Sequence, residues 1–109
     1  MSWRVKFFQT GRGDYPVKEF MMGLDEATRA KVANSISLLT DYGPILRPPY
    51  IKKLQDKLYE LRVSGKVAVR IFYTIVDGKY YLLHGFKKKT EKTPLKEIKT
   101  ALDRMKMLI

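Results

Sequence analysis

The side chains best suited to chemistry in this sequence fall between Glu60 and Lys89. Arg62 and Arg70 carry planar, permanently charged guanidinium groups, which match the geometry of a phosphate. Glu60 and His84 are the nearby groups that can take up or release a proton. Together they could cleave RNA without a metal: a base takes the 2′-hydroxyl proton, cations stabilise the pentavalent phosphorane, and an acid protonates the 5′-oxygen.

Each of these groups also has a plainer interpretation. Glu60 and the two arginines could form a solvated ion pair on the surface. His84, the single histidine of the chain, could be a hydrogen-bonded core residue. The lysine run that follows it could be a solvated turn. The residue types alone leave both interpretations open.

The charge of the chain is unevenly distributed. The sequence has 22 basic and 11 acidic residues, a net charge of +11. Residues 1–45 carry a net +1, whereas residues 46–109 hold sixteen basic and six acidic residues, a net +10. Such a field favours a polyanion as the partner, either RNA, DNA or an acidic protein.

Length and composition exclude several classes of protein. A chain of 109 residues makes one domain, residues 1–109, and its 45% hydrophobic content is ordinary for a soluble globular fold. The absence of cysteine excludes disulfide scaffolds and thiol catalysis, and a single histidine excludes His/Cys zinc sites. There is no G-x-x-x-x-G-K phosphate loop. We therefore predict no metal and no cofactor.

Because no apolar run approaches the ~20 residues of a membrane span, we expect a cytoplasmic protein without membrane contacts.

Turn and cap residues divide the chain into short elements. Asp77-Gly78 is the strongest hairpin signal, and three prolines within residues 44–55 predict no regular structure there. The expected elements are a half-buried strand at 3–7, a helix from Pro16 to Gly23 with Asp14 or Tyr15 as cap, a helix from the cap Asp25 to Tyr42-Gly43, strands at 58–63, 67–76 and 79–86, and a helix capped by Thr93 with Pro94 in its first position. The order β-α-α-β-β-β-α predicts an α+β fold, a small antiparallel sheet with helices packed on one face.

The register of the first hairpin decides which side chains share a face. A three-residue loop, Ser64 to Lys66, pairs Val63 with Val67 and places Glu60 opposite Arg70. Glu60, Arg62 and Arg70 then share an exposed face, because side chains alternate along a strand. An exposed Arg70 predicts that Arg70→Ala changes stability by no more than about 1 kcal/mol. His84 falls on the apolar side with Leu82 and Phe86 unless a bulge intervenes, which does not suit a catalytic histidine.

Several segments resemble the phage-derived branch of the RelE/HigB toxins, and the resemblance covers essentially the whole chain. They are Pro49 to Leu54, Leu58-Tyr59-Glu60-Leu61-Arg62, Val69-Arg70-Ile71-Phe72-Tyr73, Leu82 to Thr90, and Lys92-Thr93-Pro94. The resemblance implies a RelE-like fold and a toxin of a type II toxin–antitoxin pair. Such a toxin is an mRNA endonuclease that cuts transcripts within the ribosomal A site.

The resemblance also assigns residues. Arg62 and Arg70 match basic positions of the family, and Lys87 to Lys89 fall where the family has a basic catalytic residue. Glu60 reverses the charge at its position, and no tyrosine follows Tyr81 to match the one near the C-terminus of many members. The general base is therefore either Glu60 or His84. The candidate catalytic residues are Glu60, Arg62, Arg70, His84 and Lys87, and the candidate RNA-binding residues are Lys52, Lys53, Lys88, Lys89 and Lys92.

The implied partners are mRNA, the ribosome and a small antitoxin, one with a HigA-like helix-turn-helix domain. The antitoxin is expected to contact the two N-terminal helices or the terminal helix, whose narrow apolar stripe is Leu95, Ile98, Leu102, Met105 and Ile109. Two other classes stay open. One is a ParE-like inhibitor of DNA gyrase, and the other is a non-catalytic nucleic-acid-binding protein whose cations only grip phosphate.

Overall fold

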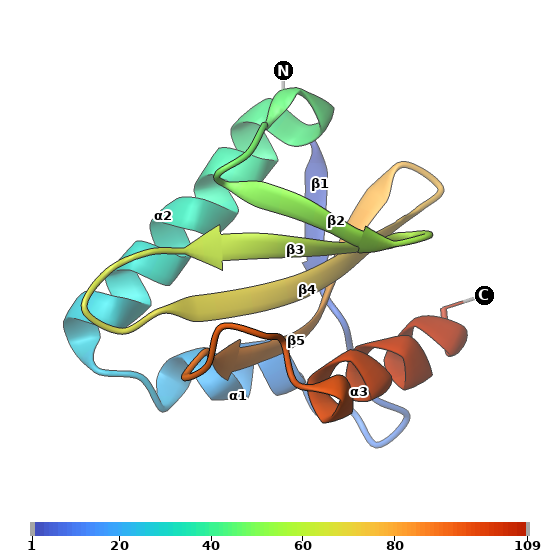
Figure 1. Cartoon of the computed structure of the whole chain (residues 1–109). Coiled ribbons are helices and arrows are strands. Elements are labelled where there is room, and N and C mark those ends of the chain that lie inside the picture. The colour runs from blue at the N-terminus through green and yellow to red at the C-terminus, as the bar shows by residue number, and fades with distance from the viewer. Residues whose placement is uncertain (1, 109) are drawn as a thin grey trace.

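Five strands and three α-helices form the fold in residues 2–108, the part of the chain that this computed structural model describes (Figure 1). In chain order they are β1 (Arg4–Phe7), α1 (Pro16–Met22), α2 (Glu26–Tyr42), the short 3-10 helix η1 (Gly43–Ile45), β2 (Ile51–Gln55), β3 (Leu58–Val63), β4 (Val69–Val76), β5 (Lys79–Lys87) and α3 (Leu95–Lys106). All predicted helices and strands are confirmed, with shifts of a few residues at their ends.

The sheet differs from the prediction at both edges. Its strand order is β1-β5-β4-β3-β2, and β1 runs parallel to β5, so the sheet is mixed rather than antiparallel. The strand β2 lies in the segment where no regular structure was predicted. The three prolines of that segment end at Pro49, before β2 begins, and Ile51 pairs with Leu61 of β3. The chain therefore has four strands between α2 and α3, not three.

Helices cover both faces of the sheet, which corrects the expectation of one covered face. On one face, α1 and α2 pack through Val17, Val32 and Leu39 against apolar residues of β3, β4 and β5. On the other, Ala101 of α3 packs in a second cluster with Phe72 and Phe86. Because both faces of β4 and β5 carry large apolar side chains, each face needs its own cover.

The helix ends follow the local signals closely. Pro16 occupies the first turn of α1, and Tyr15 is the N-cap residue. Gly43 ends α2 with φ 48°, and a Cβ on it would lie 2.5 Å from the Trp3 ring, so only glycine fits there. The N-cap of α3 is Pro94, one residue later than predicted.

The apolar stripe of α3 is only partly buried. Ala101 is its buried residue, whereas Leu95 is 82% exposed. Ile98, Leu102 and Met105 are half-buried, and Ile109 lies outside the described residues.

We expect the cap of α2 to make stability depend on acid pH. The Asp25 carboxylate accepts the Thr28 N–H at 3.0 Å and the Thr28 hydroxyl at 2.6 Å. These hydrogen bonds lower the pKa of Asp25 below its usual 3.8, so the cap stabilises the fold above that pH and is lost as pH falls through the lowered pKa. Asp25→Ala should lower Tm at pH 7, with a difference that narrows toward pH 2. Asp25→Asn, which caps without titrating, is the control, and a difference that stays constant with pH would contradict this account.

The hairpin of β3 and β4 has a different register from the predicted one. Val63 pairs with Val69 and Arg62 with Arg70. The connecting loop therefore continues to Ala68, two residues beyond its predicted end at Lys66. A shift of two residues leaves every side chain on its face, because the alternation has a period of two. The predicted grouping of Glu60, Arg62 and Arg70 on one face is therefore confirmed, although Glu60 lies opposite Phe72.

A β-bulge in β5 determines the side of His84. Tyr73 pairs with Leu82 and Phe72 with His84, so Leu83 is an extra residue in β5. The extra residue reverses the alternation. His84 and Phe86 consequently project from the same face as Arg70, and not from the face of Leu82.

Candidate functional site

One face of the sheet brings most of the candidate residues together. Residues directly opposite each other in a ladder share a face, and the pairing gives two neighbouring rows. The first row is Lys52, Glu60, Phe72 and His84, and the second is Arg62, Arg70 and Phe86. Lys53 pairs with Tyr59 and therefore projects from the other face.

Glu60 lies between the two arginines. Its Oε1 atom is 3.5 Å from Arg62 Nε and 3.2 Å from Arg70 Nε. Glu60 is only 2% exposed and Arg70 8%, whereas the Arg62 side chain is 35% exposed. The prediction that all three are exposed is wrong for Glu60 and Arg70. The apolar cluster of Leu58, Phe72 and Phe86 occupies the same face and shields them from water.

Burial changes what the Glu60–Arg70 pair can do. Loss of water lowers the pKa of Arg70 from its usual value, while the Glu60 carboxylate opposes the change, and an arginine stays charged in proteins. Arg70 Nη1 donates to the Val69 carbonyl at 3.0 Å. Glu60 Oε2 and Arg70 Nε have no well-aligned hydrogen bond among the described residues. Glu60 is thus placed to hold the arginines and is too buried to meet a substrate.

A second polar cluster joins β5 to α3. His84 Nε2 lies 2.8 Å from Glu97 Oε1, and Arg104 Nη1 lies 3.2 Å from His84 Nδ1. Since arginine only donates, Nδ1 accepts and Nε2 carries the proton that is donated to Glu97. Arg104 is itself held by the Leu83 carbonyl at 2.8 Å, and burial lowers its pKa. This arrangement orients the His84 ring and selects one tautomer.

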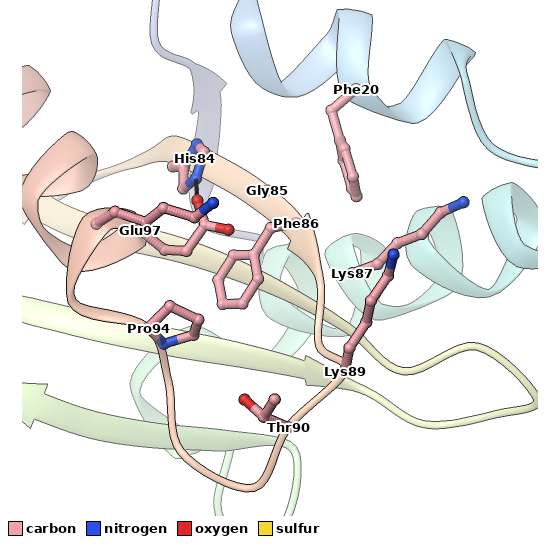
Figure 2. A pocket seen from close by; sticks show the side chains of 10 residues that line it. Phe20, His84, Gly85, Phe86, Lys87, Lys89, Thr90, Pro94 and Glu97 are labelled. Carbon is pink, nitrogen blue, oxygen red and sulfur yellow. Dashed lines mark hydrogen bonds and ion pairs between the residues drawn. The ribbon is translucent and has the colours of Figure 1, made fainter.

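A groove of about 530 Å³ opens beside His84 and Glu97. Figure 2 shows this pair on one side of the groove, Lys87 and Lys89 on the other, and the Phe86 ring between them. The His84 and Phe86 rings stack with centroids 5.8 Å apart. The groove therefore combines a hydrogen-bonded His–Glu pair, two ammonium groups and an aromatic surface, which suit a phosphate-containing ligand with bases that stack.

The remaining lysines are divided between locations. Lys87 pairs with Val69, so it starts on the face opposite Arg70 and reaches the groove at the end of β5. Lys88 is half-buried, and its N–H bonds to the Ala68 carbonyl at 2.9 Å. Lys92 is exposed in the loop before α3, and it does not line the groove.

Glu97 and Arg104 are not among the residues predicted from the sequence. They are two turns apart on α3 and face β5 together, a spacing that marks one side of a helix. That spacing could have shown that the two residues share one side of a helix, but no neighbouring residue indicates that this side contacts His84. Within residues 2–108, no three His, Cys, Asp or Glu side chains are grouped to hold a metal ion. No helix in the described part of the chain is long and apolar enough to cross a membrane.

Comparison with known families gives one match. A family model described as "Phage derived protein Gp49-like (DUF891)" matches residues 19–106. The match runs from within α1 to the end of α3, and it includes every residue of the two polar clusters and of the groove. No curated protein gives a match to the sequence.

Proposed function

This chain belongs to the phage-derived Gp49-like family, and from that premise we propose that it is a toxin that cleaves mRNA. The family is associated with RelE/ParE-like toxins of toxin–antitoxin systems. The observation that carries the proposal is the placement of Arg62, Arg70 and His84 on one sheet face, with His84 bonded to Glu97 of α3 beside a lysine-flanked groove.

The residues take different roles in the proposed reaction. Arg70 and His84 are diagonal neighbours on adjacent strands, about 7–8 Å apart, and Arg62 lies one strand farther away, opposite Arg70. The exposed Arg62 contacts the phosphate, and Arg70 adds charge from beneath it. Glu60 is a positioning residue for both arginines. Lys87 and Lys89 neutralise neighbouring phosphates.

The His84–Glu97 pair carries the proton transfers. The Glu97 carboxylate takes the proton of the 2′-hydroxyl, because both ring nitrogens of His84 are already hydrogen-bonded. The 2′-oxygen attacks the phosphorus as the bond to the 5′-oxygen breaks. Glu97 then returns this proton to the leaving 5′-oxygen, so the products are a 2′,3′-cyclic phosphate and a 5′-hydroxyl end. The reaction uses a nucleophile from the RNA itself and needs no metal.

The wider setting of the proposal follows the resemblance to RelE/HigB toxins. The substrate is mRNA on the ribosome, and the partner is an antitoxin with a HigA-like helix-turn-helix domain. The net charge of +11 supports polyanionic partners. A toxin of this kind acts in the cytoplasm, where its mRNA substrates are translated.

Induced expression followed by primer extension on cellular mRNA tests the function. We expect cut transcripts with wild type and about 10²-fold less cleavage with Arg62→Ala, since one cation at the developing charge is lost. Arg12→Ala removes the same charge from the exposed turn before α1 and serves as the control. Intact mRNA with DNA damage would support a gyrase inhibitor instead, and neither effect would support a non-catalytic nucleic-acid-binding protein.

A further inference from the structure

The second half of β5 lacks a neighbouring strand on one side. β1 pairs with β5 only from Lys79 to Leu82, and the Phe8 N–H then bonds to the Leu82 carbonyl at 2.9 Å. Beyond this point β5 continues to Lys87, paired with β4 alone. Residues 84–87 therefore have no strand partner on the side where β1 pairs with the first half of β5.

Strand alternation identifies the backbone groups at this edge. The Lys88 N–H points toward β4, where it bonds to the Ala68 carbonyl. Because successive residues direct their N–H and C=O groups to opposite sides of a strand, Gly85 and Lys87 direct theirs to the open edge. Among the described residues, no backbone group bonds to Gly85 or Lys87 from that side. An unpaired row of this kind is a template for another strand.

The groove lies along the same edge. Phe20 of α1 packs over Gly85 on one face of the sheet, where a Cβ would come within 2.7 Å of its ring. His84 and Phe86 project from the opposite face. Side chains from both faces line one cavity, which requires the cavity to be beside the strand and not above it. The space next to the unpaired backbone groups is thus open (Figure 2).

The charges around the edge define its occupant. Lys87, Lys89 and Lys96 line the groove, and none of them forms an ion pair within the described part of the chain. We propose that this edge binds an extended acidic segment of a partner protein, which adds to β5 as a strand in line with β1. Main-chain hydrogen bonds to Gly85 and Lys87 hold the segment, and its carboxylates face the three lysines.

This proposal rests on the proposed function in one respect, since it names the partner that closes the reactive groove. A strand at this edge would cover His84 and Glu97 and exclude RNA from them. It would neutralise the lysines at the same time. Strand addition itself is independent of any cleavage activity, so the two can be tested separately.

Peptide binding to the full chain tests the strand. The probe is a synthetic seven-residue peptide in which valine alternates with aspartate and glutamate. The control has the same charge, with proline in place of valine, because proline cannot donate to a β-ladder. We expect the probe at millimolar concentration to slow amide hydrogen exchange at Gly85 and Lys87 at least tenfold, and the control to have no such effect. Absence of this protection, or equal protection by both peptides, would overturn the proposal.

A variant pair separates the edge N–H from the lysine charge. Proline is tolerated at an edge position whose N–H faces outward, so Lys87→Pro should keep the wild-type Tm. It should bind the probe at least tenfold more weakly than Lys87→Ala, which loses the same charge and keeps the N–H. Equal binding by the two variants would contradict strand addition. A probe N-methylated at alternate residues makes the same test on wild type, should Lys87→Pro fail to fold.

These binding measurements contain no RNA, so their outcome does not depend on the proposed cleavage. Inhibition of RNA cleavage by the probe is then measured on the active protein. Protection of Gly85 and Lys87 without any cleavage to inhibit would support the edge site and contradict the nuclease. Cleavage that continues while the edge is protected would show that the strand does not close the reactive groove and would overturn that part of the inference.

Discussion

Arg70→Ala is expected to lower the free energy of unfolding by about 3 kcal/mol, the lower end of the range for breaking a buried ion pair. The substitution leaves the Glu60 carboxylate buried with one oxygen already lacking a hydrogen bond. Arg62 remains 3.5 Å away and offsets part of the loss. The expectation from the sequence, a change of no more than about 1 kcal/mol, assumed an exposed surface pair. Urea unfolding at pH 7 measures the difference.

Two further variants distinguish a buried pair from general damage. Arg62→Ala removes the more exposed partner and should cost no more than about 1 kcal/mol. Glu60→Leu combined with Arg70→Met removes both charges and should recover most of the stability, since apolar replacements of a buried pair are often neutral or stabilising. Wild-type stability in Arg70→Ala would show that the pair is solvated and that Arg70 is free to contact RNA.

Glu97→Gln is expected to reduce RNA cleavage by about 10²–10⁴-fold, the usual contribution of a general acid–base group. A glutamine at this position still accepts a hydrogen bond from the His84 Nε2–H group through its carbonyl oxygen, so the geometry of the pair is kept. It cannot take up a proton, which removes the proposed transfer. Single-turnover cleavage of an RNA substrate, or of mRNA on ribosomes, measures the rate.

Asp103→Asn is the matched control on the same helix. Asp103 pairs with Lys99 at 3.0 Å on the exposed side of α3, and its neutralisation should leave both the cleavage rate and Tm nearly unchanged. Thermal unfolding of Glu97→Gln should also match wild type. Full cleavage by folded Glu97→Gln would remove Glu97 from the chemistry and leave His84 as the candidate base.

Features that depend on neighbouring residues could be predicted from the amino-acid sequence. Asp25 caps α2, Gly43 ends it and Asp77-Gly78 makes the tight turn between β4 and β5, as predicted. Each of these residues acts on backbone groups only a few positions away. The shared face of Glu60, Arg62 and Arg70 was also predictable, because alternation along a strand tolerates an error of two residues in the loop.

Pairing between distant segments could not be predicted from local sequence. β1 runs parallel to β5, and its partner is more than seventy residues away in the chain. β2 forms where prolines argued against a strand, because the edge of β3 supplies its hydrogen bonds. The bulge at Leu83 moved His84 to the face of Arg70. None of these has a local signal, since each depends on which partner strand is available.

The candidate site itself shows the same division. Sequence reasoning found the arginines, His84 and the lysines by residue type, but it placed Glu60 and Arg70 in water. Their burial depends on apolar side chains from three strands that cover one face together with α3. Glu97 and Arg104 are 13 and 20 residues from His84 along the chain, so only the packing of α3 on β5 makes them its hydrogen-bond partners. Such contacts are set by how whole elements pack, which periodicity and spacing do not specify.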